Sequence, residues 1–332
     1  MVTKAGEFNL ISDVDGILVG NSEDKLDTTG VTVVLPRMRC VASVDIRGGA
    51  PGTRETDTLK PENAVNRIDA IVLSGGSVFG LEASSSVTSW LKKRKRGLSV
   101  RGNIIPIVPS AIIFDFPINQ NRNWDDNNPF INLGNEACEK ASRKFELGNI
   151  GAGIGATAGR LKGGLGSASY VNESGWQVGA LSVVNPYGDV VIPGSDKFWA
   201  SQVEFSDEFG GFGSANISQN QIEYDLSSAL GGNTTISVVA TNVILSKSEA
   251  LRLAIMCQDG IGKAIRPAHS PYDGDTVFVI STGLLKVSEK PEIVLSKLGN
   301  LAADCVARSI ARGVYYAESL NGYNSYRDFH KI

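Results

Sequence analysis

Thr234 is the residue with the clearest potential for chemistry, because Gly231, Gly232 and Asn233 precede it and a run of strand-forming residues follows. A threonine hydroxyl can attack the carbonyl of the residue before it and so cut the chain. The freed threonine then carries its own general base, since an α-amine has an unperturbed pKa of about 7.7–8. The local pattern by itself favours a threonine that simply begins a strand, where β-branched residues are common.

Two aspartates, Asp273 and Asp275, stand two residues apart around Gly274. On an extended segment both carboxylates would point to the same face and could act together. Asp-Gly is also a frequent turn sequence, and here it would only lead into the next strand. From the residues alone, the turn is the preferred interpretation.

Ser77 stands at the expected start of a helix, where it would either cap the helix or present N–H groups to a ligand. It does not complete a serine-hydrolase motif, because Phe79 occupies the position of the final glycine. A Ser-His-Asp triad would depend entirely on His269, since the only other histidine is His330, two residues from the C-terminus. We therefore expect His269 to be structural.

Glycine is dense over residues 148–166, but no nucleotide motif is complete there. Residues 151–156 (GAGIGA) break the dinucleotide spacing at its last position, and residues 159–164 (GRLKGG) lack the Lys-Ser/Thr ending of a phosphate-binding loop. Close backbone packing or turns with positive φ are the favoured explanation, ahead of a generic anion site.

The composition excludes several classes of protein. The 332 residues include 32 Lys+Arg against 35 Asp+Glu, a net charge of −3 that offers no basic excess for nucleic acid. The four cysteines are far apart and form no CxxC pair, so neither a zinc site nor a disulfide framework is predicted. Without an apolar run of 18 residues or a signal-peptide pattern, we expect a cytoplasmic protein that does not bind a membrane.

The hydrophobic pattern predicts a mixed α/β chain in which strands and helices alternate in both halves. Residues 92–96 (KKRKR) are interpreted as the solvated C-terminus of the first helix. Asn135 is expected to cap the second helix. The expected strands are 31–35, 40–46, 69–73, 104–113, 179–184, 189–193, 234–245 and 276–282, and the expected helices are 78–92, 135–146, 246–264 and 291–316.

Taken together, these segments resemble the self-processing peptidase family of L-aminopeptidase/D-esterases and β-aminopeptidases (the DmpA-like, P1 or S58 family). The likeness is greatest to its threonine-nucleophile branch, which includes the nylon-oligomer endohydrolase. It extends in family order from about residue 10 to residue 316. The segments that carry it are 48–57 (GGAPGTRETD), 72–83 (VLSGGSVFGLEA), 148–153 (GNIGAG), 162–167 (KGGLGS), 184–188 (VNPYG), 232–237 (GNTTIS) and 266–275 (RPAHSPYDGD).

The resemblance implies one domain, residues 1–332, with a four-layer αββα sandwich similar to N-terminal-nucleophile hydrolases but with different connectivity. It implies cleavage between Asn233 and Thr234 into an α-chain of residues 1–233 and a β-chain of residues 234–332, with Thr234 as nucleophile in both self-cleavage and turnover. Asn185 matches the family asparagine that helps to hold the oxyanion. Asp273 and Asp275 match the acidic pair that contacts and orients the nucleophile.

The chain departs from the family pattern at two places. Where the branch carries a lysine, one alignment puts Arg160, with Lys162 two residues later. Arginine cannot serve as a base, so Lys162 is the expected catalytic residue if a proton must move, whereas Arg160 could suffice if only a positive charge is needed. Residues 109–115 lack the glutamate that binds a substrate amine in β-aminopeptidases, and Asp115 is the available substitute.

The substrate is thus expected to be a small peptide or another amide, bound near Gly75, Gly76, Ser77 and Asp115. The resemblance implies no cofactor and no metal. It implies a homo-oligomer, a tetramer of αβ units. An endo-amidase or acyl transferase on non-peptide amides, and an inactive scaffold of the same fold, remain as alternatives.

Overall fold

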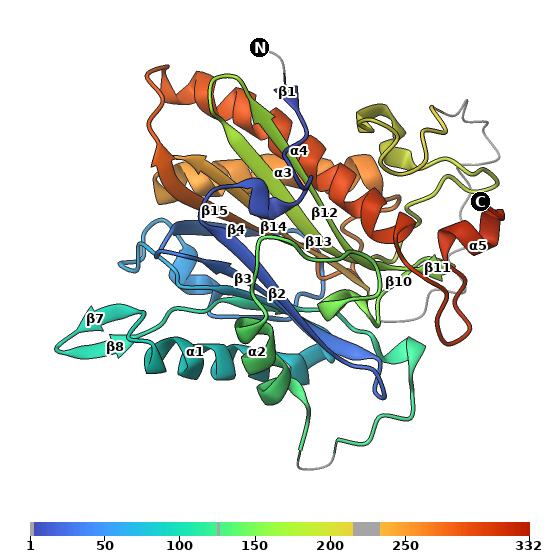
Figure 1. Cartoon of the computed structure of the whole chain (residues 1–332), viewed down its shortest axis with the longest axis horizontal. Helices are drawn as coiled ribbons and strands as arrows, with labels where there is room; N and C mark the ends of the chain where they lie inside the picture. The colour runs from blue at the N-terminus through green and yellow to red at the C-terminus, as the bar shows by residue number, and fades with distance from the viewer. Residues whose placement is uncertain (1–2, 125–126, 215–232) are drawn as a thin grey trace.

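The computed structural model describes residues 3–124, 127–214 and 233–332. Two β-sheets lie face to face between two pairs of helices (Figure 1). The larger sheet has the order β1-β12-β13-β14-β15-β4, and the smaller has the order β2-β3-β6-β9-β5. The strands of the larger sheet are β1 (Thr3–Lys4), β12 (Gly164–Asn172), β13 (Gln177–Asn185), β14 (Thr234–Val243), β15 (Thr276–Leu285) and β4 (Val41–Ile46). Those of the smaller sheet are β2 (Ile17–Asp24), β3 (Thr29–Pro36), β6 (Ile71–Ser74), β9 (Ser110–Ile112) and β5 (Thr53–Arg54).

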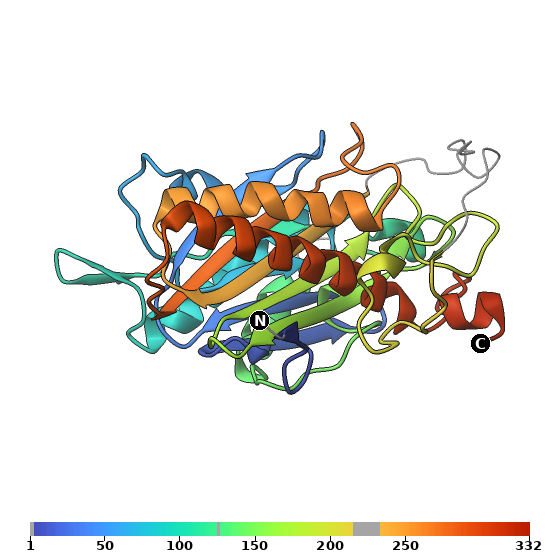
Figure 2. The ribbon, with the colours of Figure 1, turned by 90° about the horizontal axis from the view of Figure 1, so that it is seen from above.

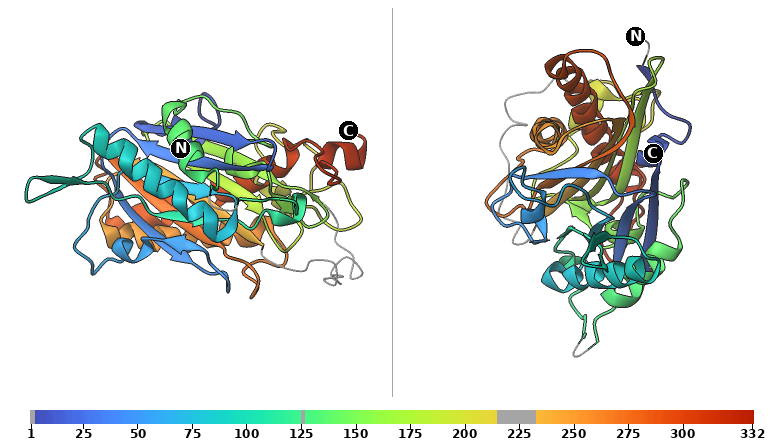
Figure 3. Two further views of the ribbon diagram at one scale, coloured as in Figure 1. Left: turned by 90° about the horizontal axis from the view of Figure 1, so that it is seen from below. Right: turned by 90° about the vertical axis from the view of Figure 1, so that its left-hand side faces the viewer.

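The helices cover the outer faces of the two sheets. Helices α3 (Lys247–Ala264) and α4 (Pro291–Tyr315) pack on the larger sheet, and α1 (Ala83–Lys93) and α2 (Phe130–Glu139) pack on the smaller one. Figure 2 shows α3 and α4 side by side along their sheet, and the end-on view in Figure 3 shows the layers in succession. A short helix, α5 (Tyr326–His330), lies near the C-terminus.

The remaining elements are short. Two strand pairs stand apart from the sheets, β7 (Leu98–Val100) with β8 (Asn103–Ile105), and β10 (Thr157–Ala158) with β11 (Leu161–Lys162). The 3-10 turns are η1 (Ile11–Asp13), η2 (Thr56–Leu59), η3 (Ser77–Glu82), η4 (Phe116–Ile118), η5 (Gly151–Gly153) and η6 (Trp199–Val203).

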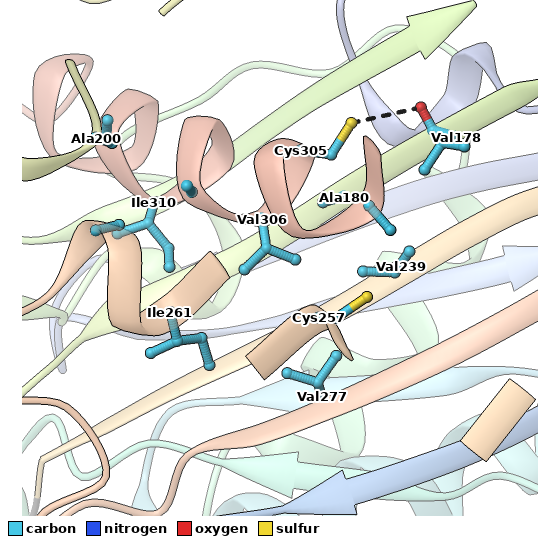
Figure 4. Close-up of a cluster of buried hydrophobic side chains, with 14 of the residues drawn as sticks. Val178, Ala180, Ala200, Val239, Cys257, Ile261, Val277, Cys305, Val306 and Ile310 are labelled. Carbon is cyan, nitrogen blue, oxygen red and sulfur yellow. Dashed lines mark hydrogen bonds between the residues drawn. The ribbon is translucent and has the colours of Figure 1, made fainter. Parts of the chain in front are cut away.

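Each interface between layers is an apolar core. One core lies between the two sheets, one between the smaller sheet and α1/α2, and one between the larger sheet and α3/α4. Figure 4 shows part of the last of these, where Cys257 and Val306 face Val239. The predicted four-layer αββα sandwich is therefore present, because every sheet has two apolar faces to bury.

β14 lies in the interior of the larger sheet, antiparallel to β13 and parallel to β15. All ten of its residues are buried, which explains why its sequence (TTISVVATNV) is almost continuously β-branched or small. Its first residue, Thr234, lies opposite Asn185, the last residue of β13. The sheet thus fixes the end of the strand where the chemistry was predicted.

Most predicted elements are found, and three differ from the prediction. The helix expected at 135–146 begins at Phe130 and ends at Glu139, and the expected cap Asn135 lies inside it, where its amide donates to the carbonyl of Ile131. The stretch 189–193 forms only isolated bridges, Asp189 with Arg266 and Val191 with Phe198. The expected strand 104–113 is split between β8 and β9. Residues Gly231 and Gly232 lie outside the described residues.

Among the residues that the structure describes, no helix combines the length and the apolar character needed to cross a membrane.

Candidate active site

Thr234 and the peptide bond before it are enclosed. Thr234 is 4% exposed. Its hydroxyl donates a hydrogen bond to the carbonyl oxygen of Asn233, with Oγ1 2.5 Å from that oxygen. The same carbonyl accepts the N–H of Gly274 at 3.0 Å. The Asn233–Thr234 peptide is therefore in contact with a hydroxyl and polarised by a backbone donor.

The segment 273–275 runs beside this peptide. Asn233 and Asp273 form a parallel bridge, and the backbone N–H of Thr235 donates to Oδ1 of Asp275 at 2.8 Å. Gly274 separates the two aspartates and packs so closely on the threonine that a Cβ there would lie 2.7 Å from Oγ1 of Thr234. Close packing against the Thr234 hydroxyl, and not turn geometry alone, therefore explains why residue 274 is a glycine.

Both aspartates are buried and differ in what they hold. Asp273 accepts the backbone N–H groups of Tyr187 and Ser270. Its pKa is raised, first by burial and then by the charge of Asp275. Asp275 holds the N–H of Thr235 and the side chain of His269. The Asp275 carboxylate therefore fixes the residue after Thr234, whereas the Asp273 carboxylate fixes the neighbouring loops at Tyr187 and Ser270.

Asn185 lies across the strand pair from Thr234 and is 1% exposed. Its Oδ1 accepts the backbone N–H of Thr157 at 2.8 Å, and its Nδ2 donates to the carbonyl of Phe114 at 3.2 Å. These contacts fix which end of the amide is the donor. An Nδ2 group has two protons, so one donor remains beyond the bond to Phe114.

Lys162, and not Arg160, is the buried cation next to this site. Lys162 is fully buried, and its Nζ donates to the carbonyl oxygens of Gly153, Ala156 and Gly163 at 2.8–3.2 Å. Burial lowers its pKa to about 7, with Asp115 acting in the opposite direction. Lys162 pairs in β11 with Thr157, whose N–H holds Asn185, whereas Arg160 is exposed.

The three carbonyls around Lys162 match the three protons of an ammonium group. The cage therefore suits the charged form, although burial opposes it. A neutral amine would direct its lone pair at a carbonyl oxygen. Hydrogen bonding and burial therefore act in opposite directions on the charge of Lys162.

The structure does not support Asp115 as a substrate-binding group. Its carboxylate forms an ion pair with Arg122, and both side chains are 0% exposed. The hydroxyl of Thr29 and the N–H of Gly76 also donate to it. Because both oxygens have partners within the fold and neither side chain of the pair is exposed, Asp115 is closed off from a substrate amine.

The backbone N–H groups of Gly75, Gly76 and Ser77 are likewise occupied within the fold, which corrects the expectation that they bind a ligand. The N–H of Gly75 donates to Gly30, that of Gly76 to Asp115 and that of Ser77 to Ile113. Gly76 rather than Ser77 occupies the cap position of η3, and no side chain caps that turn. Long-range contacts thus occupy the donors that the sequence suggested for a ligand.

On the sequence alone, His269 is weighed as the base of a triad and expected to be structural instead, without being placed beside Asp275. Its Nδ1 lies 2.8 Å from Oδ2 of Asp275, and its backbone N–H donates to the same oxygen at 3.0 Å. Its place in the same segment as Asp273 and Asp275 was the available signal. Among the described residues, no group of three or more metal-ligating side chains of the His, Cys, Asp or Glu type comes together.

The chain is similar to known proteins over most of its length. A sequence model of Peptidase family S58 matches residues 9–327. The chain is 42% identical to an uncharacterized aminopeptidase of Mycobacterium tuberculosis, over 97% of this chain and 98% of that protein. It is 28% identical to a 6-aminohexanoate-oligomer endohydrolase of Kocuria sp., over 92% of this chain and 83% of that protein.

Two solved structures share the fold. A Burkholderia sp. β-aminopeptidase superposes with a TM-score of 0.74 at 19% identity, covering 98% of this chain and 93% of that one. The L-aminopeptidase D-Ala-esterase/amidase of Ochrobactrum anthropi, described as a new variant among the Ntn hydrolase fold, gives 0.71 at 21% identity, covering 96% and 89%. Because the family match spans nearly the whole chain and the relatives act on amide bonds, this chain belongs to peptidase family S58 and is an amide-bond hydrolase.

Proposed function

We propose that the protein cuts its own chain between Asn233 and Thr234 and then uses Thr234 as an N-terminal nucleophile to hydrolyse amides of small substrates. The observation that carries this proposal is the contact between the Thr234 hydroxyl and the Asn233 carbonyl, 2.5 Å apart, with the N–H of Gly274 on the same oxygen. A nucleophile, its target and a donor for the developing negative charge meet at one peptide bond.

In self-cleavage, Oγ1 of Thr234 forms a bond to the carbonyl carbon of Asn233. The Asn233–Thr234 C–N bond breaks, and the hydroxyl proton passes to the leaving nitrogen. The N–H of Gly274 supports the oxyanion, because it already donates to that oxygen. Water then hydrolyses the resulting ester, which leaves a carboxylate on Asn233 and restores the hydroxyl on a Thr234 with a free amine.

In turnover, the new α-amine of Thr234 takes the proton from its own hydroxyl as Oγ1 attacks a substrate carbonyl. The protonated amine then supplies the proton to the leaving nitrogen, and water releases the acyl group. Asn185 lies across the strand pair and is our candidate for the second oxyanion donor. The buried Lys162 pairs in β11 with Thr157, whose backbone N–H donates to the Asn185 amide.

The decisive experiment is intact-mass analysis of the purified protein with three sequences at position 234. We expect wild type to give fragments 1–233 and 234–332, Thr234→Ser to give the same fragments, and Thr234→Ala to stay whole and inactive. Wild type that stays whole, or cutting that persists in Thr234→Ala, would refute the proposal. Serine is the matched control because it keeps the hydroxyl and removes only a methyl group.

A second candidate, an endo-amidase that does not require a free substrate amine, is favoured by the burial of Asp115. The carboxylate that was to bind such an amine is closed off by Arg122. Because 6-aminohexanoate-oligomer endohydrolases are among the relatives, we choose 6-aminohexanoate oligomers as the first non-peptide substrates to test.

Paired p-nitroanilides, one with a free amine and one with that amine acetylated, separate the two candidates. An aminopeptidase loses most of its kcat/KM on acetylation, whereas an endo-amidase does not. A soluble 6-aminohexanoate dimer and trimer extend the comparison to non-peptide amides.

A further inference from the structure

His269 lies in the connection between α3 and β15, six residues before Asp275. Two of its nitrogens converge on one carboxylate oxygen: the backbone N–H and Nδ1 lie 3.0 and 2.8 Å from Oδ2 of Asp275. The other oxygen, Oδ1, accepts the N–H of Thr235 at 2.8 Å. Asp275 is therefore held by His269 on one side and holds the residue next to the nucleophile on the other.

The backbone of His269 is set for this contact. Its φ is +56°, in the left-handed region that few residues other than glycine, asparagine, aspartate and histidine adopt. That conformation directs both the N–H and the ring toward the same oxygen. A carboxylate accepts hydrogen bonds, so it selects the imidazole form that carries its proton on Nδ1.

The imidazole does not act on the threonine directly. Among the described residues no hydrogen bond joins His269 to Thr234, and the chain of contacts runs His269, Asp275, Thr235. The His269 side chain is 27% exposed, whereas that of Asp275 is 1% exposed. His269 is thus the outer member of a relay whose inner end fixes the start of β14.

We propose that His269 is a positioning residue for the reaction: by orienting Asp275, it holds the start of β14 so that the Thr234 hydroxyl stays against the carbonyl it attacks. This inference rests on the proposed function. It assigns no proton transfer to the imidazole. A misplacement of the nucleophile by a fraction of an ångström lowers kcat and leaves substrate binding unchanged, so KM should stay constant.

Amide side chains test the role of the single nitrogen. Asparagine places its amide nitrogen near the position of Nδ1 and tolerates positive φ, whereas glutamine places its nitrogen near that of Nε2. We expect His269→Asn to keep self-cleavage and kcat within about 3-fold of wild type, and His269→Gln to lose roughly 10-fold or more in both. His269→Gly, which relieves the backbone conformation without restoring a donor, should be as slow as His269→Gln.

Two controls separate positioning from folding. His330→Gln alters the other histidine, on α5, and should leave both rates at the wild-type value. In Asp275→Asn, the added change His269→Gln should cost nothing further, because the relay is already broken at its inner member. Thermal unfolding of each variant identifies loss of structure.

The result that overturns the inference is His269→Gln with wild-type rates, or His269→Asn as slow as His269→Gln. Additive losses in the double variant would overturn it as well. Failure of the proposed function has a different signature, because wild type would then stay uncut or Thr234→Ala would stay active. The same series of mass and activity measurements therefore distinguishes the two failures.

Discussion

Asn185, at the end of β13, and Thr234, at the beginning of β14, are direct partners across an antiparallel strand pair. The Asn185 amide is held by Thr157 and Phe114, so its orientation is fixed before any substrate arrives. Fixed dipoles of this kind are effective at a developing charge, because they need no reorganisation during the reaction.

We predict that Asn185→Ala lowers self-cleavage and kcat by about 10²–10³-fold, the usual cost of one oxyanion donor. Asn185→Asp should be as slow, because a carboxylate cannot donate. Cleavage is followed by intact mass over time. Asn103→Ala, on the exposed β7–β8 hairpin, is the control, and an Asn185→Ala protein that is folded and cleaves normally would exclude this role.

Gly274→Ala should slow self-cleavage by about 10-fold or more, because the new methyl group would lie 2.7 Å from Oγ1 of Thr234 and must displace it. Gly262, in α3, is the matched control, since a Cβ there meets no atom within 4 Å outside its own helix. Gly262→Ala should leave cleavage unchanged and raise the unfolding free energy by up to about 1 kcal/mol. Equal cleavage rates in the two variants would contradict the close packing at 274.

Lys162 should make stability depend on pH. Burial lowers its pKa from 10.5 to about 7 in the folded protein. Between those values the unfolded chain binds more protons than the folded one, so the unfolding free energy rises with pH, by at most about 1.4 kcal/mol per unit. Lys162→Met should remove this rise.

Chemical denaturation between pH 7 and 9.5, with and without Lys162→Met, measures the rise. Both proteins also carry Thr234→Ala, so that each is expected to remain a single uncut chain during the measurement. Other titrating groups contribute equally to both proteins, so the difference in slope isolates Lys162. Equal slopes would show that the carbonyl cage keeps the ammonium charged through this range.

The buried pair of Asp115 and Arg122 should matter for stability and not for substrate affinity. Arg122→Met leaves a buried carboxylate unpaired and should lower the unfolding free energy by about 3–5 kcal/mol. Arg94→Met, which breaks the exposed pair with Glu139, should cost about 1 kcal/mol or less. Calorimetry gives both values, and a large KM increase in Asp115→Asn at unchanged stability would restore its role in binding substrate.

The sequence predicted the elements whose burial is continuous or periodic. β14 could be found because all of its residues are buried, and α3 because Ser246 and Glu249 form a capping box. The start of α2 was missed because its first N–H is held by the side chain of Asn128, two residues upstream of Phe130, and Asn135 offered an equally good cap further on.

The residues of the candidate site also divide into those that the sequence could locate and those whose surroundings it could not predict. The positions of Thr234, Asn185 and the two aspartates follow from segments that the family pattern aligns. The occupied donors of residues 75–77 could not be foreseen, since their acceptors, Gly30, Ile113 and Asp115, come from other strands and loops. Nor could the burial of Asp115, because nothing in the spacing says that Arg122 folds back on it.

The interior place of β14 has a consequence for the proposed cut. Its neighbours β13 and β15 fall on opposite sides of the Asn233–Thr234 bond, and the cores on both faces of the sheet contain residues from both pieces. The two fragments that the proposed cut would give are therefore expected to stay together while the sheet is intact. After unfolding, such fragments would have to meet by diffusion, so refolding of the cut protein would become bimolecular and depend on concentration.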